Sequence, residues 1–280
     1  MTGGRSAATT RTVARLRTTG CVFAEDEAAV LTSAAGGAGD LEAMVARRVA
    51  GEPLEHVVGW AEFCGLRIGV DPGVFVPRRR TVLLVHETVA LLTARSPATP
   101  GARTVRPVVV DLCCGSGAVG AAVLAAVPEV ELHAADVDAA AVCCARRNLS
   151  AAGGRVYQGD LFAALPTALA GRVDVVVANV PYVPTDAICG MPSEARDHEP
   201  AAALDGGPDG LGVQRRVIAA APSWLAPGGH LLVETSTRQA PATVDAFARS
   251  GLSSWVVTSD EPEAVVVVGR AAGGATVSEP

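Results

Sequence analysis

Residues 107–120 read PVVVDLCCGSGAVG, an apolar run that ends at an acid and passes into a glycine-rich turn. The run has the continuous apolar character of a strand that is buried on both faces of a sheet. In the turn, Gly115, Gly117 and Gly120 have the spacing G-x-G-x-x-G, which lets a ligand approach the backbone closely at the start of a helix. A strand, a glycine turn and a helix in this order indicate a cofactor-binding turn in an α/β fold.

Downstream of this turn, apolar runs alternate with helical segments. The remaining strands are expected at residues 130–135, 155–158, 173–178, 229–235, 255–258 and 264–268. Helices are expected between them, near residues 118–127, 138–150, 211–224 and 238–250. With the first strand at 107–112, this alternation predicts a doubly wound α/β fold that has a mostly parallel, seven-stranded sheet.

The chain upstream of the turn is organised differently. Three short helices are expected, at residues 11–19, 25–34 and 40–50. Residues 57–70, VVGWAEFCGLRIGV, alternate around Gly65 and suggest a β-hairpin. A proline-punctuated connector, an apolar helix from Thr81 and a loop rich in Pro, Gly and Ser follow. We therefore predict a small helical N-terminal domain at 1–55, a hairpin connector at 56–76 and the α/β domain at 77–280.

Composition sets limits on the function. The net charge of −6 and the scattered arginines predict no basic face, which argues against stable binding of a nucleic acid by its phosphates. The seven cysteines form no C-x-x-C motif, so we interpret them as small buried hydrophobes in a reducing cytosol and expect no metal site. No run reaches the ~18 apolar residues of a membrane span, and the N-terminus lacks the apolar core of a secretory signal. A cytoplasmic protein without membrane contact is expected.

Ligands of doubly wound sheets bind beyond the carboxyl ends of the strands, and the first of these ends carries Asp111. The glycine turn alone fits nicotinamide and flavin cofactors as well as S-adenosylmethionine. A carboxylate at this position attracts an ammonium or sulfonium cation, whereas it would repel a pyrophosphate. This favours S-adenosylmethionine, and we expect Asp111, Cys113, Gly115 and Gly117 to contact it.

The next two strand ends add further candidate cofactor residues. Asp136 can accept hydrogen bonds from both hydroxyls of a ribose, while Asp138 is expected to cap the following helix. Asp160 can accept from an adenine amino group, and Leu161 or Phe162 can pack on the ring. For Phe162, ordinary core packing is an equal alternative.

The fourth strand end is the most informative, because it leads into Asn179-Val180-Pro181-Tyr182. Asn179 offers a side-chain carbonyl oxygen, and Val180 is held extended by the proline that follows and can direct its backbone carbonyl nearby. Two acceptors that converge on one NH₂ group would bind a planar amide or an exocyclic amine and favour pyramidalising its nitrogen. Tyr182 would supply a flat wall beside the methyl donor. These residues predict methyl transfer to such a nitrogen.

At this point the chain resembles the HemK-type protein-(glutamine-N5) methyltransferases, which modify the Gly-Gly-Gln loop of translation termination factors. Residues 51–81 are similar to that family's hairpin and linker, and EPAAALDGGPDGL at 199–211 is similar to its highly specific E-P-x-x-A-L-x-G-G-x-D-G-L segment. The resemblance implies a class I S-adenosylmethionine-dependent methyltransferase domain behind a small helical domain. It also implies a protein substrate with a target glutamine, such as a peptide chain release factor, and a catalytic role for the tetrapeptide 179–182.

Three departures from the family's motifs indicate a diverged paralogue. Val180 stands at the first proline of the family's Asn-Pro-Pro-Tyr, which keeps the carbonyl but loses a fixed φ, worth about 0.4–1 kcal/mol of preorganisation. Val82 replaces the acid that ends the family's P-R-P-x-T-E, and His56 replaces its tyrosine near the hairpin. The usual termination factor is therefore one substrate hypothesis among others.

Other functions stay open at this stage. The same tetrapeptide suits an adenine-N6 nucleic-acid methyltransferase, although the acidic charge and the segment 199–211 argue against it. A dinucleotide-dependent oxidoreductase is disfavoured by Asp111 and the polar tetrapeptide, and a catalytically silent S-adenosylmethionine-binding protein remains possible through the departures. We interpret Glu199 as a structural or substrate-loop residue and the arginines at 78–80 as a solvated face or a partner contact, and we expect a monomer.

Overall fold

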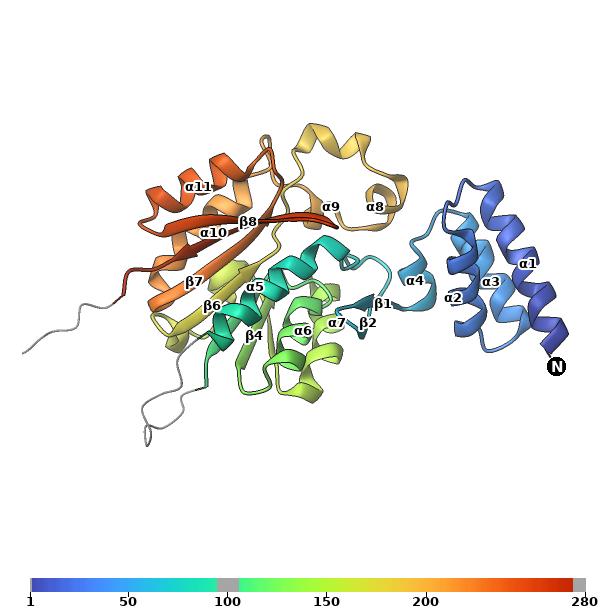
Figure 1. Cartoon of the computed structure of the whole chain (residues 1–280), viewed down its shortest axis with the longest axis horizontal. Coiled ribbons are helices and arrows are strands. Elements are labelled where there is room, and N and C mark those ends of the chain that lie inside the picture. The colour runs from blue at the N-terminus through green and yellow to red at the C-terminus, as the bar shows by residue number, and fades with distance from the viewer. Residues whose placement is uncertain (1, 95–105, 274–280) are drawn as a thin grey trace, which may run out of the picture.

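The computed structural model describes residues 2–94 and 106–273 (Figure 1). Its main sheet has seven strands in the order β5-β4-β3-β6-β7-β9-β8. The strands are β3 (Val108–Leu112), β4 (Glu131–Asp136), β5 (Arg155–Gln158), β6 (Val173–Ala178), β7 (Leu225–Thr235), β8 (Ser253–Asp260) and β9 (Glu263–Arg270). β5, β4, β3, β6 and β7 pair in parallel, while β9 is antiparallel to both of its neighbours. The predicted mostly parallel, seven-stranded sheet is confirmed.

Helices cover both faces of this sheet (Figure 1). Val109, Val175 and their neighbours on one face pack against α5 (Val82–Thr93), α6 (Ala118–Ala126) and α7 (Ala139–Leu149). Val108, Val110 and their neighbours on the other face pack against α10 (Gly212–Ala220) and α11 (Ala240–Arg249). Because successive side chains of a strand point to opposite faces, two apolar layers require the unbroken valine runs seen in the sequence.

The N-terminal segment forms a separate group of helices at one end of the molecule (Figure 1). α1 (Thr2–Thr18), α2 (Ala24–Ala34) and α3 (Ala38–Val49) enclose their own cluster of buried apolar side chains around Leu16 and Leu31. The first helix starts earlier than the predicted residue 11. The short α4 (Leu54–Val58) and the antiparallel pair β1 (Trp60–Phe63) and β2 (Leu66–Gly69) lead to the sheet, so the hairpin predicted around Gly65 is present.

Short helical turns make up most of the remaining connections. A 3-10 turn at Arg79–Thr81 precedes α5, and α8 (Ser193–His198) and α9 (Ala201–Leu204) follow β6. Further 3-10 turns lie at Ser150–Ala152, Leu161–Ala164, Thr167–Leu169, Thr185–Gly190 and Ala221–Ser223. The loop predicted from its Pro, Gly and Ser content before residue 107 falls largely outside the described residues. Within the ranges 2–94 and 106–273, no helix is long and apolar enough to cross a membrane.

The strand register brings three sequence-distant segments to one edge of the sheet. Leu112 pairs with Ala135 of β4 and with Ala178 of β6. The residues that follow these positions, Asp136 and Asn179 among them, therefore emerge side by side at the carboxyl edge. This is the edge at which doubly wound sheets bind ligands.

The tight contact between β9 and α11 gives a test of the fold. A Cβ added to Gly269 would lie 2.1 Å from Cδ1 of Phe247, a ring with no exposed surface. We expect Gly269→Ala to lower the free energy of unfolding by about 1–3 kcal/mol, because an overpacked core cannot yield without strain. Gly190→Ala is the control, since an added Cβ there meets no atom within 4 Å. Equal denaturant midpoints for the two variants would contradict this packing.

Candidate active site

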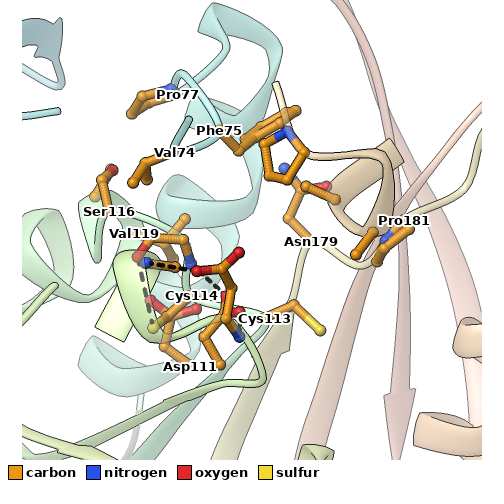
Figure 2. A pocket seen from close by; sticks show the side chains of 18 of the residues that line it. Val74, Phe75, Pro77, Asp111, Cys113, Cys114, Ser116, Val119, Asn179 and Pro181 are labelled. Carbon is orange, nitrogen blue, oxygen red and sulfur yellow. Dashed lines mark hydrogen bonds between the residues drawn. The ribbon is translucent and has the colours of Figure 1, made fainter. Parts of the chain in front are cut away.

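A pocket of about 850 Å³ opens at the carboxyl edge of the sheet (Figure 2). The β3 turn and the end of β4 form one wall, Asn179 and Pro181 face it, and Phe75 and Pro77 of the connector lie over both (Figure 2). The lining residues come from segments that are far apart in sequence: 63, 73–75, 77, 81, 111, 113–116, 118–119, 136–138, 141, 179, 181, 200 and 202–203.

Asp111 is the most deeply buried charged group of this pocket, with 2% of its surface exposed. Its Oδ2 accepts a hydrogen bond from the backbone N–H of Gly120 at 2.9 Å. A Cβ at Gly120 would lie 2.8 Å from Leu132 and 3.2 Å from that oxygen, so the close approach requires glycine. Burial, opposed by the Gly120 hydrogen bond and reinforced by the charge of Asp136, raises the pKa of Asp111 to about 7.

Asp136 ties the end of β4 to the glycine turn. One carboxylate oxygen accepts from the N–H of Gly115 and the other from the N–H of Asp138, both at 2.9 Å. Burial raises the pKa of Asp136. Since a carboxylate has about four acceptor positions, it can still accept from hydroxyl groups in the pocket. Asp138 accepts from Ala140 and Ala141 and caps α7, as predicted.

The tetrapeptide after β6 is held by contacts from three other segments. Asn179 Nδ2 donates to Oγ1 of Thr81 at 3.2 Å, and Tyr182 OH donates to Oε1 of Glu234 at 3.1 Å. Gln239 Nε2 donates to the backbone carbonyl of Tyr182 at 2.8 Å. Burial, followed by the charge of Glu234, raises the pKa of Tyr182, so its hydroxyl stays protonated. The tetrapeptide is therefore fixed to the structure around it and is not a free turn.

The segment 199–212 contacts the tetrapeptide and forms backbone hydrogen bonds with the residue that follows it. The N–H of Val183 donates to Leu204 O, and the N–H of Gly206 donates to Val183 O. A Cβ at Gly210, whose φ is +75°, would lie 2.3 Å from the carbonyl oxygen of Tyr182. A side chain at this position would displace the tetrapeptide backbone, which gives a physical reason for the last glycine of DGGPDG.

Six of the predicted site residues meet in the pocket: Asp111, Cys113, Gly115, Asp136, Asn179 and Pro181. Val180 is buried beside them in the core, with 1% of its surface exposed, and Tyr182 contacts Glu234. Gly117 packs against Leu149 at the start of α6, where a Cβ would lie 3.0 Å from Cδ1 of that leucine.

The residues predicted for the adenine ring have other contacts in this structure. Phe162 is 4% exposed and stacks on Trp224 at 5.4 Å between ring centroids, so core packing is the alternative that its position supports. Leu161 packs beside this same cluster, and Asp160 forms a 2.5 Å ion pair with Arg216. None of the three lines the pocket. The 3-10 turn after β5 directs these side chains toward the α10 side of the sheet instead.

Several lining residues were not predicted. Val137 is 60% exposed at the pocket, an apolar side chain suited to packing on a flat ring. Phe75 belongs to the connector, Thr81 to the 3-10 turn before α5 and Pro200 to the segment after α8. The proline pattern of the connector predicted an irregular segment. It did not predict that this segment passes over the carboxyl edge of the sheet, because that position depends on tertiary packing.

The sheet, the glycine turn and the two acids beside it define the class: an S-adenosylmethionine-dependent methyltransferase. Asp111 can face a cationic group and Asp136 a ribose, so the residues fit this cofactor. The family model "Methyltransferase small domain" matches residues 88–189. A methyltransferase structure from Pyrococcus furiosus, 16% identical, covers 81% of this chain and 97% of its own with a TM-score of 0.51, which shows the same fold.

Two curated relatives are more similar in sequence. The release factor glutamine methyltransferase of Geobacter sulfurreducens is 36% identical over 231 residues, which span 81% of this chain and 76% of the relative. The 4-amino-L-phenylalanine/4-methylamino-L-phenylalanine methyltransferase of Streptomyces pristinaespiralis is 38% identical over 218 residues, 78% of this chain and 72% of the relative. The chain belongs to the HemK-type methyltransferase family, as its motifs suggested.

The pKa of Asp111 gives a pH test of the cofactor site. A carboxyl group with a pKa of about 7 is ionised above pH 7 and protonated below it. Because a cationic ligand prefers the ionised form, affinity for S-adenosylmethionine should fall about tenfold between about pH 8 and pH 6. Calorimetry at several pH values checks this. Asp111→Asn should bind weakly with little pH dependence, and an equally flat profile for the parent protein would contradict the assignment.

Proposed function

We propose that this protein transfers a methyl group from S-adenosylmethionine to the side-chain amide nitrogen, N5, of a glutamine in a protein, with a peptide chain release factor as substrate. The observation that carries the proposal is the arrangement of Asn179 opposite the cofactor residues in one pocket. Its Nδ2 is occupied by Thr81, which leaves Oδ1 as an acceptor for a substrate N–H. The curated relative from Geobacter sulfurreducens bears the name of this activity.

The chain's own groups account for the chemistry by binding and orientation. Asn179 Oδ1 and the backbone carbonyl of Val180 would accept hydrogen bonds from the two N–H groups of the target amide. Holding both hydrogens weakens conjugation of the nitrogen lone pair with the carbonyl and directs that pair toward the cofactor wall. The bound cofactor supplies an electrophilic methyl group on its sulfonium. The methylated nitrogen is cationic and loses a proton to water, so the site needs no general base.

A second candidate substrate is an aromatic amine. The relative from Streptomyces pristinaespiralis is named for two aminophenylalanine substrates and is 38% identical to this chain. Two acceptors that bind an amide NH₂ also suit an aniline NH₂. The net charge of −6 continues to argue against a nucleic-acid substrate.

We also propose the arrangement in which this activity operates. The chain would act as a cytoplasmic monomer, with a helical domain at 1–55, a hairpin connector at 56–76 and the methyltransferase domain at 77–280. The separate apolar cluster of α1–α3 supports a distinct helical domain, and its core extends to Val57 of α4. The connector's place over the pocket supports a role for residues 73–77 in closing the site.

The proposal is tested by methyl transfer from labelled donor to three substrates: a release factor, free 4-amino-L-phenylalanine and duplex DNA. We expect label on the release factor. Transfer to the free amino acid alone would establish the second candidate instead, and label on DNA alone would reject both.

Removing the Asn179 side chain tests the mechanism. Asn179→Ala should retain the parent's affinity for S-adenosylmethionine and lose about 10²–10³ in kcat, the typical cost of one preorganised contact in an active site. Calorimetry and initial rates measure the two quantities separately. A variant that methylates as fast as the parent would show that the tetrapeptide is only a turn.

A further inference from the structure

The arginine-rich turn at 78–81 touches the site at three points. Arg78 Nη2 lies 2.6 Å from both carboxylate oxygens of Glu199. Arg80 Nε donates to Glu234 Oε1 at 3.2 Å. Thr81 Oγ1 accepts from Asn179 Nδ2 at 3.2 Å. This turn was expected to be a solvated face or a partner contact, but two of its arginines are partners of acids inside the protein.

Both acids are buried, and this makes the turn hard to move. The side chains of Glu199 and Glu234 are each 1% exposed. Removing the partner of a buried charge is strongly destabilising, because the remaining charge has neither water nor a counterion. Glu199 also accepts from the N–H of Val76, which fixes the connector just before the turn. The ion pairs of Arg78 and Arg80 therefore fix the position of the turn.

Thr81 lies at the end of this locked turn and is 3% exposed. Its hydroxyl accepts a hydrogen bond from Asn179 Nδ2, and this arrangement leaves Oδ1 for the pocket. Because the threonine is buried and its turn is held by two ion pairs, the contact fixes where the Asn179 side chain lies.

We infer that Thr81 is a positioning residue that holds the Asn179 side chain at the pocket wall, and that the ion pairs of Arg78 and Arg80 hold Thr81 in place. The inference rests on the proposed function, in which Asn179 Oδ1 accepts from the target nitrogen. Thr81 does not touch the reacting atoms. It also lines the pocket, but a valine keeps the shape of the side chain there, so loss of the hydroxyl should affect turnover far more than binding of the methyl donor.

The sequence allows a test without any substrate. Asn148 and Asn179 are the two asparagines of the chain, so ¹⁵N-asparagine labelling gives two side-chain amide signals. Asn148 is the internal reference, because its Nδ2 donates to Gly69 O and Ser116 O at 2.8 Å, away from Thr81. Thr81→Val keeps the side-chain shape and removes the hydroxyl. It should shift the Asn179 signals and speed their hydrogen exchange, with the Asn148 signals unchanged, and Thr81→Ser should restore the parent spectrum.

Kinetics on the release factor complete the test. Thr81→Val should lower kcat about tenfold, the equivalent of one lost hydrogen bond, without changing affinity for S-adenosylmethionine. Thr81→Ser should recover most of the rate. Arg80→Gln should reproduce part of the loss, whereas Arg79→Gln should not, because Arg79 is exposed and has no ion pair within the described part of the chain.

The outcomes separate the two proposals. If the Asn179 signals do not respond to Thr81→Val, or if Thr81→Ser fails to restore spectrum and rate, Thr81 does not position the amide and the inference is overturned. If the signals respond but the parent protein methylates no release factor, the positioning holds and the proposed function fails.

Discussion

β3, β4 and β6 pair so that their carboxyl ends lie beside one another at one edge of the sheet, and the active site depends on this register. Leu112 pairs with both Ala135 and Ala178, so the glycine turn, Asp136 and Asn179 leave the sheet at one height. A slip of one residue in any of these strands would reverse the faces of its side chains and separate the cofactor residues from the tetrapeptide. The valine-rich layers on both faces fix this register, so the core and the site are consequences of the same packing.

A second set of contacts turns this edge into a pocket of defined shape. Gly210 lets one loop approach the backbone at Tyr182, and buried Glu199 and Glu234 bind the connector and the turn that follows it through two arginines. These ion pairs join segments around the pocket, whereas Asp111 lines the pocket and forms no ion pair within residues 2–94 and 106–273. A buried acid whose pKa is about 7 is suited to a cationic ligand. The carboxylate of Asp111 is thus suited to binding a ligand, whereas the carboxylates of Glu199 and Glu234 join segments of the protein.

Local patterns predicted the sheet, the glycine turn and the tetrapeptide, because each depends on residues close together in sequence. For Phe162 the sequence left two alternatives open, and the structure supports core packing, since a 3-10 turn of four residues decides which face its ring meets. The arginines at 78–80 showed their partners only in three dimensions, because Glu199 and Glu234 lie more than a hundred residues away. Val137 had no distinctive pattern of its own, and Thr81 was only part of the segment similar to the family's P-R-P-x-T-E. Their importance comes from the segments that the fold brings beside them.

The central claim is that the acceptors of the tetrapeptide select the nitrogen of a planar amide. It is tested most directly by locating the transferred methyl group. The parent protein would be incubated with a release factor and S-adenosylmethionine carrying a deuterated methyl group, and the modified peptide fragmented by mass spectrometry. The account predicts one deuterated methyl group on the side chain of a glutamine. Label on a lysine, an arginine, a carboxylate or a terminal amine would contradict it.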